Sequence, residues 1–186
     1  MTLEEGKRKV YMLLDEYSSG GAITPDADIE AKMADFFDTA QKLVTAIKPI
    51  RRVAEIVRTE GQTEYALPAD CRKLVCIRRG GKRTRRYAWH GTKLVIPAGE
   101  TETVEAEYFA WPETLGPDTP DSYVFEAAED AAQACCFYVA SQQLISDLVL
   151  DYTALRNEWL SALQLLTPEN PEGCYGMRQA LFGGGA

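Results

Sequence analysis

Two closely spaced turns between Arg72 and Ile96 constrain the fold of this 186-residue chain more than any other feature. The segment reads RKLVCIRRGGKRTRRYAWHGTKLVI. The commonest two-residue hairpin turns need positive φ at central positions, which glycine adopts without a steric penalty. Gly80-Gly81 therefore predicts one tight hairpin, and His90-Gly91 predicts a second. A chain that reverses direction twice in so short a stretch is expected to form an antiparallel sheet.

A turn at Gly80-Gly81 also predicts which residues pair. Arg79 would lie opposite Lys82, and Arg78 would lie opposite Arg83. In this register one face collects large apolar side chains, and the second turn extends it: Leu74, Cys76, Tyr87, Trp89, Leu94 and Ile96. Because side chains alternate between the two faces of a strand, a slip of one residue would turn this set to solvent. We expect this face to pack on the core.

Further strands are expected on both sides of the hairpins. Residues 50–57 and 65–67 read as short strands, and residues 104–108 alternate apolar side chains with Glu105 and Glu107. These two carboxylates should point away from the core. The cations expected beside them are Lys73, Arg86 and Lys93.

Charge is strongly segregated along the sequence. The net charge is −8, yet residues 72–97 carry nine Lys or Arg and no acid, a charge of +9. Residues 1–71 sum to −4, and residues 98–186, with two Arg and fifteen acids, sum to −13. Segregation of this kind bears on association and partners rather than on fold.

The tip of the first hairpin places like charges opposite each other, which destabilises a strand pair. We therefore expect the tip to project from its own domain and to contact an anionic partner. We call its cations the basic tip and take them as candidate subunit-interface or channel residues: Arg78, Arg79, Lys82, Arg83, Arg85 and Arg86. The alternative is a solvated tip whose charge protects a sheet edge from aggregation.

Helical patterns flank this region. Thr2 and Glu5 form a capping box, and apolar residues recur at helical spacing from Ile29 to Ile47. A third helix is expected to open at Asp121 or Ser122, and a fourth to cover residues 148–166. The predicted fold is α+β. Residues 1–49 and 122–166 form a bundle of about four helices, residues 50–112 form an inserted antiparallel β module, and residues 167–186 form an extended C-terminal tail.

The tail sequence, TPENPEGCYGMRQALFGGGA, is rich in proline and glycine and does not favour a packed element of its own. Its large apolar side chains are candidate anchors for docking on a partner: Tyr175, Met177, Leu181 and Phe182. A disordered terminus, or one folded back on its own domain, is the alternative.

No enzyme signature is present. His90 is the single histidine and sits in a predicted turn, and no nucleotide-binding or hydrolase motif occurs. The five cysteines lack Cys-x-x-Cys spacing, so we expect buried, reduced thiols rather than a disulfide or metal site. No signal peptide or bilayer-spanning apolar stretch is evident. We predict a protein with no catalytic role, no cofactor, no metal and no membrane association.

Nucleic-acid binding is the main alternative function. Nine cations close to Tyr87 and Trp89 could follow a phosphate backbone. Both aromatic residues, however, lie on the predicted core face, where they are not available to stack on bases. The acidity of the rest of the chain would also repel a duplex.

The order of elements and several local patterns resemble the head–tail connector, or portal adaptor, proteins of tailed bacteriophages. The similar pieces are the helix ending in AQKLVTAI, the segments EYALPADCRKLVCI, YAWHGTKLVIPAG and EAEYFAWPETL, and the alanine-rich stretch of residues 126–143. The likeness covers most of the chain. The family has no catalytic signature, so no active-site residues carry over.

The resemblance implies a structural virion protein made in the host cytoplasm and located at the head–tail junction. It implies a homo-oligomeric ring, twelve-fold by resemblance, that binds the portal protein and a downstream tail or head-closure protein. Such a ring would extend the DNA channel and contact DNA without sequence specificity. The charge map independently suits a ring, because a basic patch that meets a different, acidic patch on the next copy makes a heterologous contact.

Overall fold

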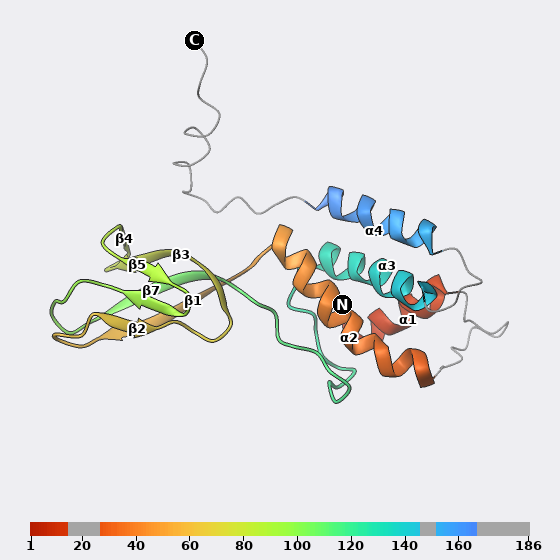
Figure 1. Cartoon of the computed structure of the whole chain (residues 1–186), viewed down its shortest axis with the longest axis horizontal. Helices are drawn as coiled ribbons and strands as arrows, with labels where there is room; N and C mark the ends of the chain where they lie inside the picture. Colours follow the sequence, from red (N-terminus) through yellow and green to blue (C-terminus); the bar gives the residue numbers. More distant parts are fainter. Residues whose placement is uncertain (15–26, 146–151, 167–186) are drawn as a thin grey trace, which may run out of the picture.

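The computed structural model describes residues 1–14, 27–145 and 152–166, which form a mixed α+β fold (Figure 1). Within these residues the chain forms four helices and two antiparallel sheets. In order, the elements are α1 (Leu3–Leu13), α2 (Ala27–Ile47), β1 (Ile50–Arg58), β2 (Glu64–Ala66), β3 (Cys71–Arg79), β4 (Lys82–Thr84), β5 (Ala88–His90), β6 (Lys93–Val95), β7 (Glu102–Ala110), α3 (Glu129–Ile145) and α4 (Thr153–Leu165). The predicted tail lies outside the described residues.

Helix α3 is the centre of the helical bundle and packs against α1, α2 and α4. Its buried positions are mostly small, which lets neighbouring helix backbones approach closely: Ala131, Ala132, Cys135, Cys136, Val139 and Ala140. The predicted capping box opens α1, where the Glu5 amide donates to Thr2 Oγ1 at 3.1 Å and the Thr2 amide donates to Glu5 Oε2 at 2.8 Å. None of the helices in the described ranges is long and apolar enough to cross a membrane.

Helix α3 begins at Glu129, so the prediction of a helix from Asp121 or Ser122 is wrong. The preceding residues run extended beside the N-terminus. The Leu3 amide donates to the Tyr123 carbonyl at 2.8 Å, and the Phe125 amide donates to the Met1 carbonyl at 3.1 Å. Because these backbone groups already have partners, they are not used in a first helical turn.

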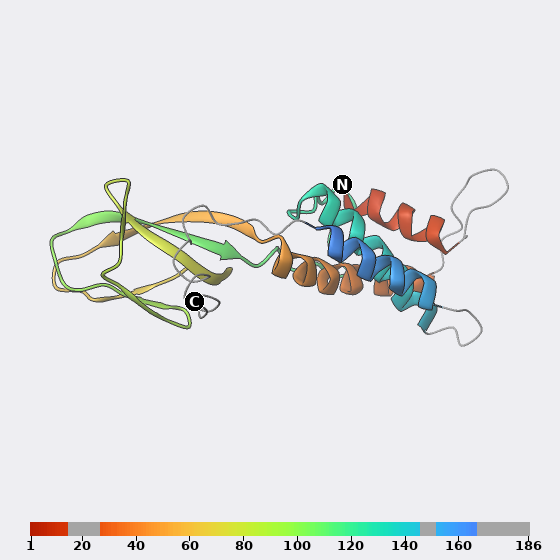
Figure 2. The same ribbon diagram turned by 90° about the horizontal axis from the view of Figure 1, so that it is seen from above.

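The β module stands beyond the C-terminal end of α2, on the side away from the other helices (Figures 1 and 2). One sheet has the order β1-β7-β3-β4, and the other has the order β2-β6-β5. Their inner faces enclose a second hydrophobic core, separate from that of the bundle: Ile56, Tyr65, Leu67, Leu74, Ile77, Leu94, Ile96, Val104, Ala106, Tyr108 and Ala110. The chain enters the module through β1 and leaves it through β7, which pair along their whole length.

The first predicted hairpin is confirmed. Arg79 pairs with Lys82 across Gly80 and Gly81, whose φ values are +53° and +74°. The register predicted for the residues after Thr84 is wrong, because β4 ends there and the chain crosses to the other sheet. Tyr87 and Trp89 therefore reach the core from the opposite sheet and are half-buried there.

The second hairpin turn falls one residue later than predicted. His90 pairs with Lys93, so the turn residues are Gly91 and Thr92. Gly91 takes the left-handed conformation with a φ of +58°. In this turn the first of the two central residues has a positive φ. Glycine favours that position, so the central residues are Gly91 and Thr92 instead of His90 and Gly91.

Cys76 does not point into the core of the β module, contrary to the sequence prediction. A register shift between Leu74 and Cys76 inserts one extra residue opposite β7. Such a bulge reverses which face the following side chains occupy. Ile77 therefore takes the core position, and the Cys76 thiol donates to Glu107 Oε2 at 3.2 Å on the other face of the sheet.

Several polar contacts join the β module to the helical bundle. Arg52 forms ion pairs with both Asp70 and Glu126. The guanidinium of Arg72 donates to the Thr45 carbonyl at 2.8 Å and lies 4.9 Å from the ring centroid of Trp111. These contacts surround the place where α2 becomes β1 and fix the direction in which the module extends.

Ile77 offers a test of the second core. Its side chain is fully buried between the two sheets. We expect Ile77→Ala to lower the free energy of unfolding by about 2–5 kcal/mol, because it removes buried methyl groups and leaves a cavity. The matched control is Leu165→Ala, at a side chain that is 82% exposed, where a change within about 0.5 kcal/mol is expected. Denaturant unfolding followed by tryptophan fluorescence measures both, and equal losses would contradict the assignment of Ile77 to the core.

Candidate interaction surface on the basic hairpin

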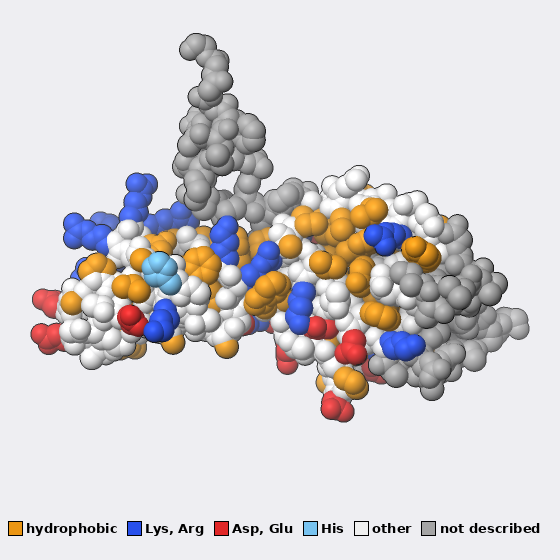
Figure 3. Space-filling model, viewed as in Figure 1, with side chains coloured by type: hydrophobic (Ala, Val, Ile, Leu, Met, Phe, Trp, Pro, Cys, Tyr) orange, Lys and Arg blue, Asp and Glu red, His pale blue; other side chains and the backbone are white. Residues whose placement is uncertain are grey.

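The basic tip lies on β3, on β4 and on the link that follows β4. Figure 3 shows Lys and Arg side chains gathered on the β module at the end away from the helices. Five of the six residues are exposed, and Arg78 is half-buried. The structure thus brings all six together within residues 78–86, but their surroundings differ.

Arg78 is neutralised within its own domain. Its Nη2 donates to Glu107 Oε2 at 2.9 Å, and Arg51 Nη1 lies 3.4 Å from Glu107 Oε1. Glu107 is only 3% exposed. Burial alone would raise the pKa of Glu107, but the hydrogen bonds from Arg78 and Cys76 and the nearby guanidinium charges lower it below its ordinary value. This carboxylate is the counter-charge that allows Arg78 to lie against the sheet.

The cations that pair with Glu107 differ from those expected, and Glu105 forms no ion pair with a described residue. Glu107 points away from the core, as predicted, but its cations are Arg51 and Arg78 rather than Lys73, Arg86 or Lys93. The reason is strand order: β7 lies between β1 and β3, so the nearest cations come from these strands. Arg51 was missed because sequence pattern does not reveal that β1 pairs with β7.

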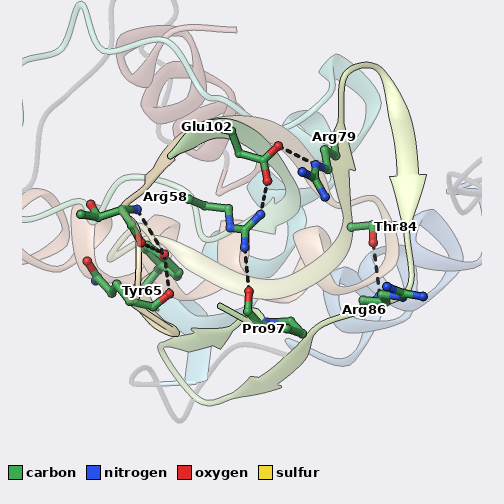
Figure 4. Close-up of polar contacts among 9 residues, drawn as sticks. Arg58, Tyr65, Arg79, Thr84, Arg86, Pro97 and Glu102 are labelled. Carbon is green, nitrogen blue, oxygen red and sulfur yellow. Dashed lines mark hydrogen bonds and ion pairs between the residues drawn. The ribbon is translucent and has the colours of Figure 1, made fainter. Parts of the chain in front are cut away.

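Arg79 is also paired. Its Nε lies 2.5 Å from Glu102 Oε2, and the other oxygen of Glu102 contacts Arg58 (Figure 4). Arg58 Nη2 donates onward to the Pro97 carbonyl at 2.6 Å. This chain of contacts ties the turn end of the β3–β4 hairpin to the loop before β7. Arg58 was not a candidate from sequence, although it is the most deeply buried of these arginines, with 4% exposure.

A cavity of about 140 Å³ lies beside this network. It is lined by three arginines and by backbone and apolar groups of both sheets: Arg58, Ile77, Arg79, Thr84, Arg86, Ile96, Pro97, Ala98, Gly99 and Val104. Ligand pockets usually span about 300–1,000 Å³, so this one is small. Two of its three arginines, Arg58 and Arg79, already pair with Glu102, so most of its positive charge is neutralised within the domain.

The other four cations of the basic tip, Lys82, Arg83, Arg85 and Arg86, are exposed, and Arg83 interacts electrostatically with Cys76. Lys82, Arg85 and Arg86 are exposed, and no carboxylate of the described residues lies within ion-pairing distance of their side chains. The amide of Arg86 donates to Thr84 Oγ1 at 3.3 Å, which bends the link after β4 (Figure 4). These three residues form the part of the basic tip that is available to a partner.

The thiols and the histidine do not form a reactive centre in the described part of the chain. Cys71, Cys76, Cys135 and Cys136 are free thiols, and burial raises the pKa of Cys136 to about 12. His90 is exposed at the end of β5. Within the same ranges, no group of three or more His, Cys, Asp or Glu side chains is arranged to hold a metal ion. Cys174 lies outside the described residues, as do the predicted docking anchors Tyr175, Met177, Leu181 and Phe182.

No protein-family model matches this chain, and no curated protein sequence matches it either.

Glu107 gives a pH test of the network beneath the hairpin. Its pKa in the folded protein lies below the ordinary value of 4.5. Its stabilising contribution is therefore complete above that value and is lost as the pH falls through the lowered folded-state pKa. We expect Glu107→Gln to be less stable than the wild type at neutral pH, with a difference that shrinks as the pH falls below 4.5.

The control is Glu105→Gln, which removes an exposed carboxylate two residues away on the same strand. Denaturant unfolding at several pH values measures both variants. A stability difference for Glu107→Gln that does not change with pH would contradict the proposed role of its charge.

Proposed function

We propose that this chain is a non-catalytic structural subunit that assembles into a homo-oligomeric ring, as a head–tail connector between the portal and the tail of a bacteriophage virion. The observation that carries the proposal is the group of exposed cations Lys82, Arg85 and Arg86, which lack counter-charges among the described residues of an otherwise acidic chain. Separation of charge on one subunit favours contacts between unlike patches on successive copies, and such contacts form rings when the rotation closes.

A protein partner suits this hairpin better than nucleic acid does. Arg78 and Arg79 already bind Glu107 and Glu102, so the positive charge left for a phosphate backbone is smaller than the sequence indicates. The two aromatic side chains nearby do not form a stacking platform either. Tyr87 and Trp89 are half-buried against the module core, and the indole N–H of Trp89 donates to the Gly91 carbonyl.

The finer features of the proposal come from the resemblance. They are a twelve-fold ring at the head–tail junction, a portal contact through an extended C-terminal tail, and a downstream tail or head-closure partner. In this arrangement the β modules help to form the DNA channel. The basic tip would then face either a neighbouring subunit or DNA in the channel, and these two placements predict different results.

Reversal of charge at the tip tests the role in assembly. We expect Lys82→Glu/Arg85→Glu to leave the subunit folded but to reduce it to monomers, because both side chains are exposed and their attraction to an acidic neighbour becomes repulsion. Light scattering gives the particle mass, alone and with a portal protein. The matched control is Lys32→Glu/Arg156→Glu, which makes the same change of charge at exposed positions on α2 and α4.

An unchanged particle mass for the tip variant would contradict the assembly role. If the ring persists and only retention of packaged DNA changes, the tip faces the channel. A wild-type monomer that binds duplex DNA with a steep dependence on salt would instead favour the nucleic-acid alternative.

Deletion of residues 168–186 tests the proposed tail contact. We expect the truncated chain to keep nearly the same thermal stability and to lose binding to the portal, because the apolar side chains of this segment are proposed to dock on that partner. Calorimetry and co-sedimentation with portal protein measure the two effects. A large loss of stability would show that the segment belongs to the core of the subunit.

A further inference from the structure

The outer face of the four-stranded sheet, opposite its core face, carries an acidic and apolar strip at the β1 edge. Val53, Glu55 and Val57 occupy every second position of β1 and therefore share this face. The two valines are 61% and 64% exposed. Glu55 lies directly opposite Glu105 of β7. Both carboxylates are exposed, and neither forms an ion pair with a described residue. We call these four residues the acidic strip.

The acidic strip carries an electrostatic cost in the isolated subunit. Like charges directly opposite each other on antiparallel strands destabilise the pair. Arg78, the β3 neighbour of Glu105, is bonded to Glu107 instead. The nine-residue edge strand β1 exposes two valines and the unpaired Glu55, next to the unpaired Glu105 of β7, and such an edge is of the kind that proteins usually cover or pair.

The basic tip places positive charges opposite each other at the other edge of the same sheet. The strand order β1-β7-β3-β4 puts β1 and β4 on its two outer edges. On β3 and β4, Arg78 faces Arg83 and Arg79 faces Lys82, again like charges directly opposed. On the outer face, the β1 edge thus exposes two valines and two carboxylates without ion pairs to described residues, beside Arg51, which pairs with Glu107. The β4 edge concentrates positive charge.

From this arrangement we infer that the acidic strip is the docking surface for the basic tip of a second copy of this chain, with Lys82 and Arg85 placed against Glu55 and Glu105. The contact relieves like-charge repulsion on both sides and covers Val53 and Val57. Because the basic tip and the acidic strip lie at different edges of the sheet in one subunit, the contact between copies is heterologous. It continues from copy to copy until a ring closes. The inference rests on the proposed self-assembly and identifies which surface accepts the tip.

Compensating charge reversal tests this pairing. We expect Glu55→Lys/Glu105→Lys to weaken self-association at least about 100-fold, as Lys82→Glu/Arg85→Glu does, because each creates like charges across the contact. Combining all four substitutions should restore association, since the signs are then exchanged. The control is Glu60→Lys/Glu100→Lys, two exposed acids of the same module outside the acidic strip, which should associate like the wild type.

Sedimentation equilibrium at several protein concentrations gives the association constant, and circular dichroism checks that each variant is folded. A folded Glu55→Lys/Glu105→Lys variant that assembles like the wild type overturns the docking surface and leaves the proposed ring intact. If the variant with all four substitutions is folded but does not regain association, this pairing is also overturned. A wild type that stays monomeric at all concentrations, alone and with a portal protein, overturns the ring and the contact together.

Discussion

Arginine guanidiniums join the β module to the helical bundle, and Arg52 makes the ion pairs among these contacts. Arg52 lies near the start of β1 and contacts Asp70, which precedes β3, and Glu126, which precedes α3. Asp70 in turn accepts a hydrogen bond from the Tyr108 hydroxyl at 3.2 Å, so the same carboxylate holds the end of β7. Removal of Arg52 would leave two partly buried carboxylates without their counter-charge. The direction of the β module, and with it the position of the basic tip, depends on this contact.

The acids within the β module decide which cations remain available. Glu107 and Glu102 neutralise the arginines that lie against the sheet, whereas Lys82 and Arg85 lie beyond their reach. A net charge of −8 therefore describes the surface poorly. On the outer face of the four-stranded sheet, the carboxylates without ion pairs in the described part of the chain, Glu55 and Glu105, lie on β1 and β7, and the exposed cations lie on and after β4 at the other edge. That separation links the fold to the proposed head-to-tail assembly.

The candidate site could be predicted from sequence only in its local features. The six cations of the basic tip all fall within residues 78–86, so their clustering follows from a single turn at Gly80-Gly81. Their division into paired and exposed residues could not be predicted, because it depends on Arg51, Arg58 and Glu102 from strands distant in the sequence. The acidic strip was missed for the same reason: Glu55 and Glu105 are neighbours only through the pairing of β1 with β7.

Short-range chemistry determined what the sequence alone could specify: the α+β class, the capping box at Thr2, the end of α2 before Pro49 and the pairing of Arg79 with Lys82. Each depends on backbone preferences within a few residues. The tertiary structure decided the bulge after Leu74, the crossing of the chain after Thr84 and the late start of α3 at Glu129. In each case distant backbone or apolar groups compete for the same residues: β7 for Ile77, the second sheet for Trp89 and the N-terminus for Phe125. The free energy of burial and hydrogen bonding with these distant groups outweighs the local backbone preferences. Local preferences do not reveal which distant groups will be in contact.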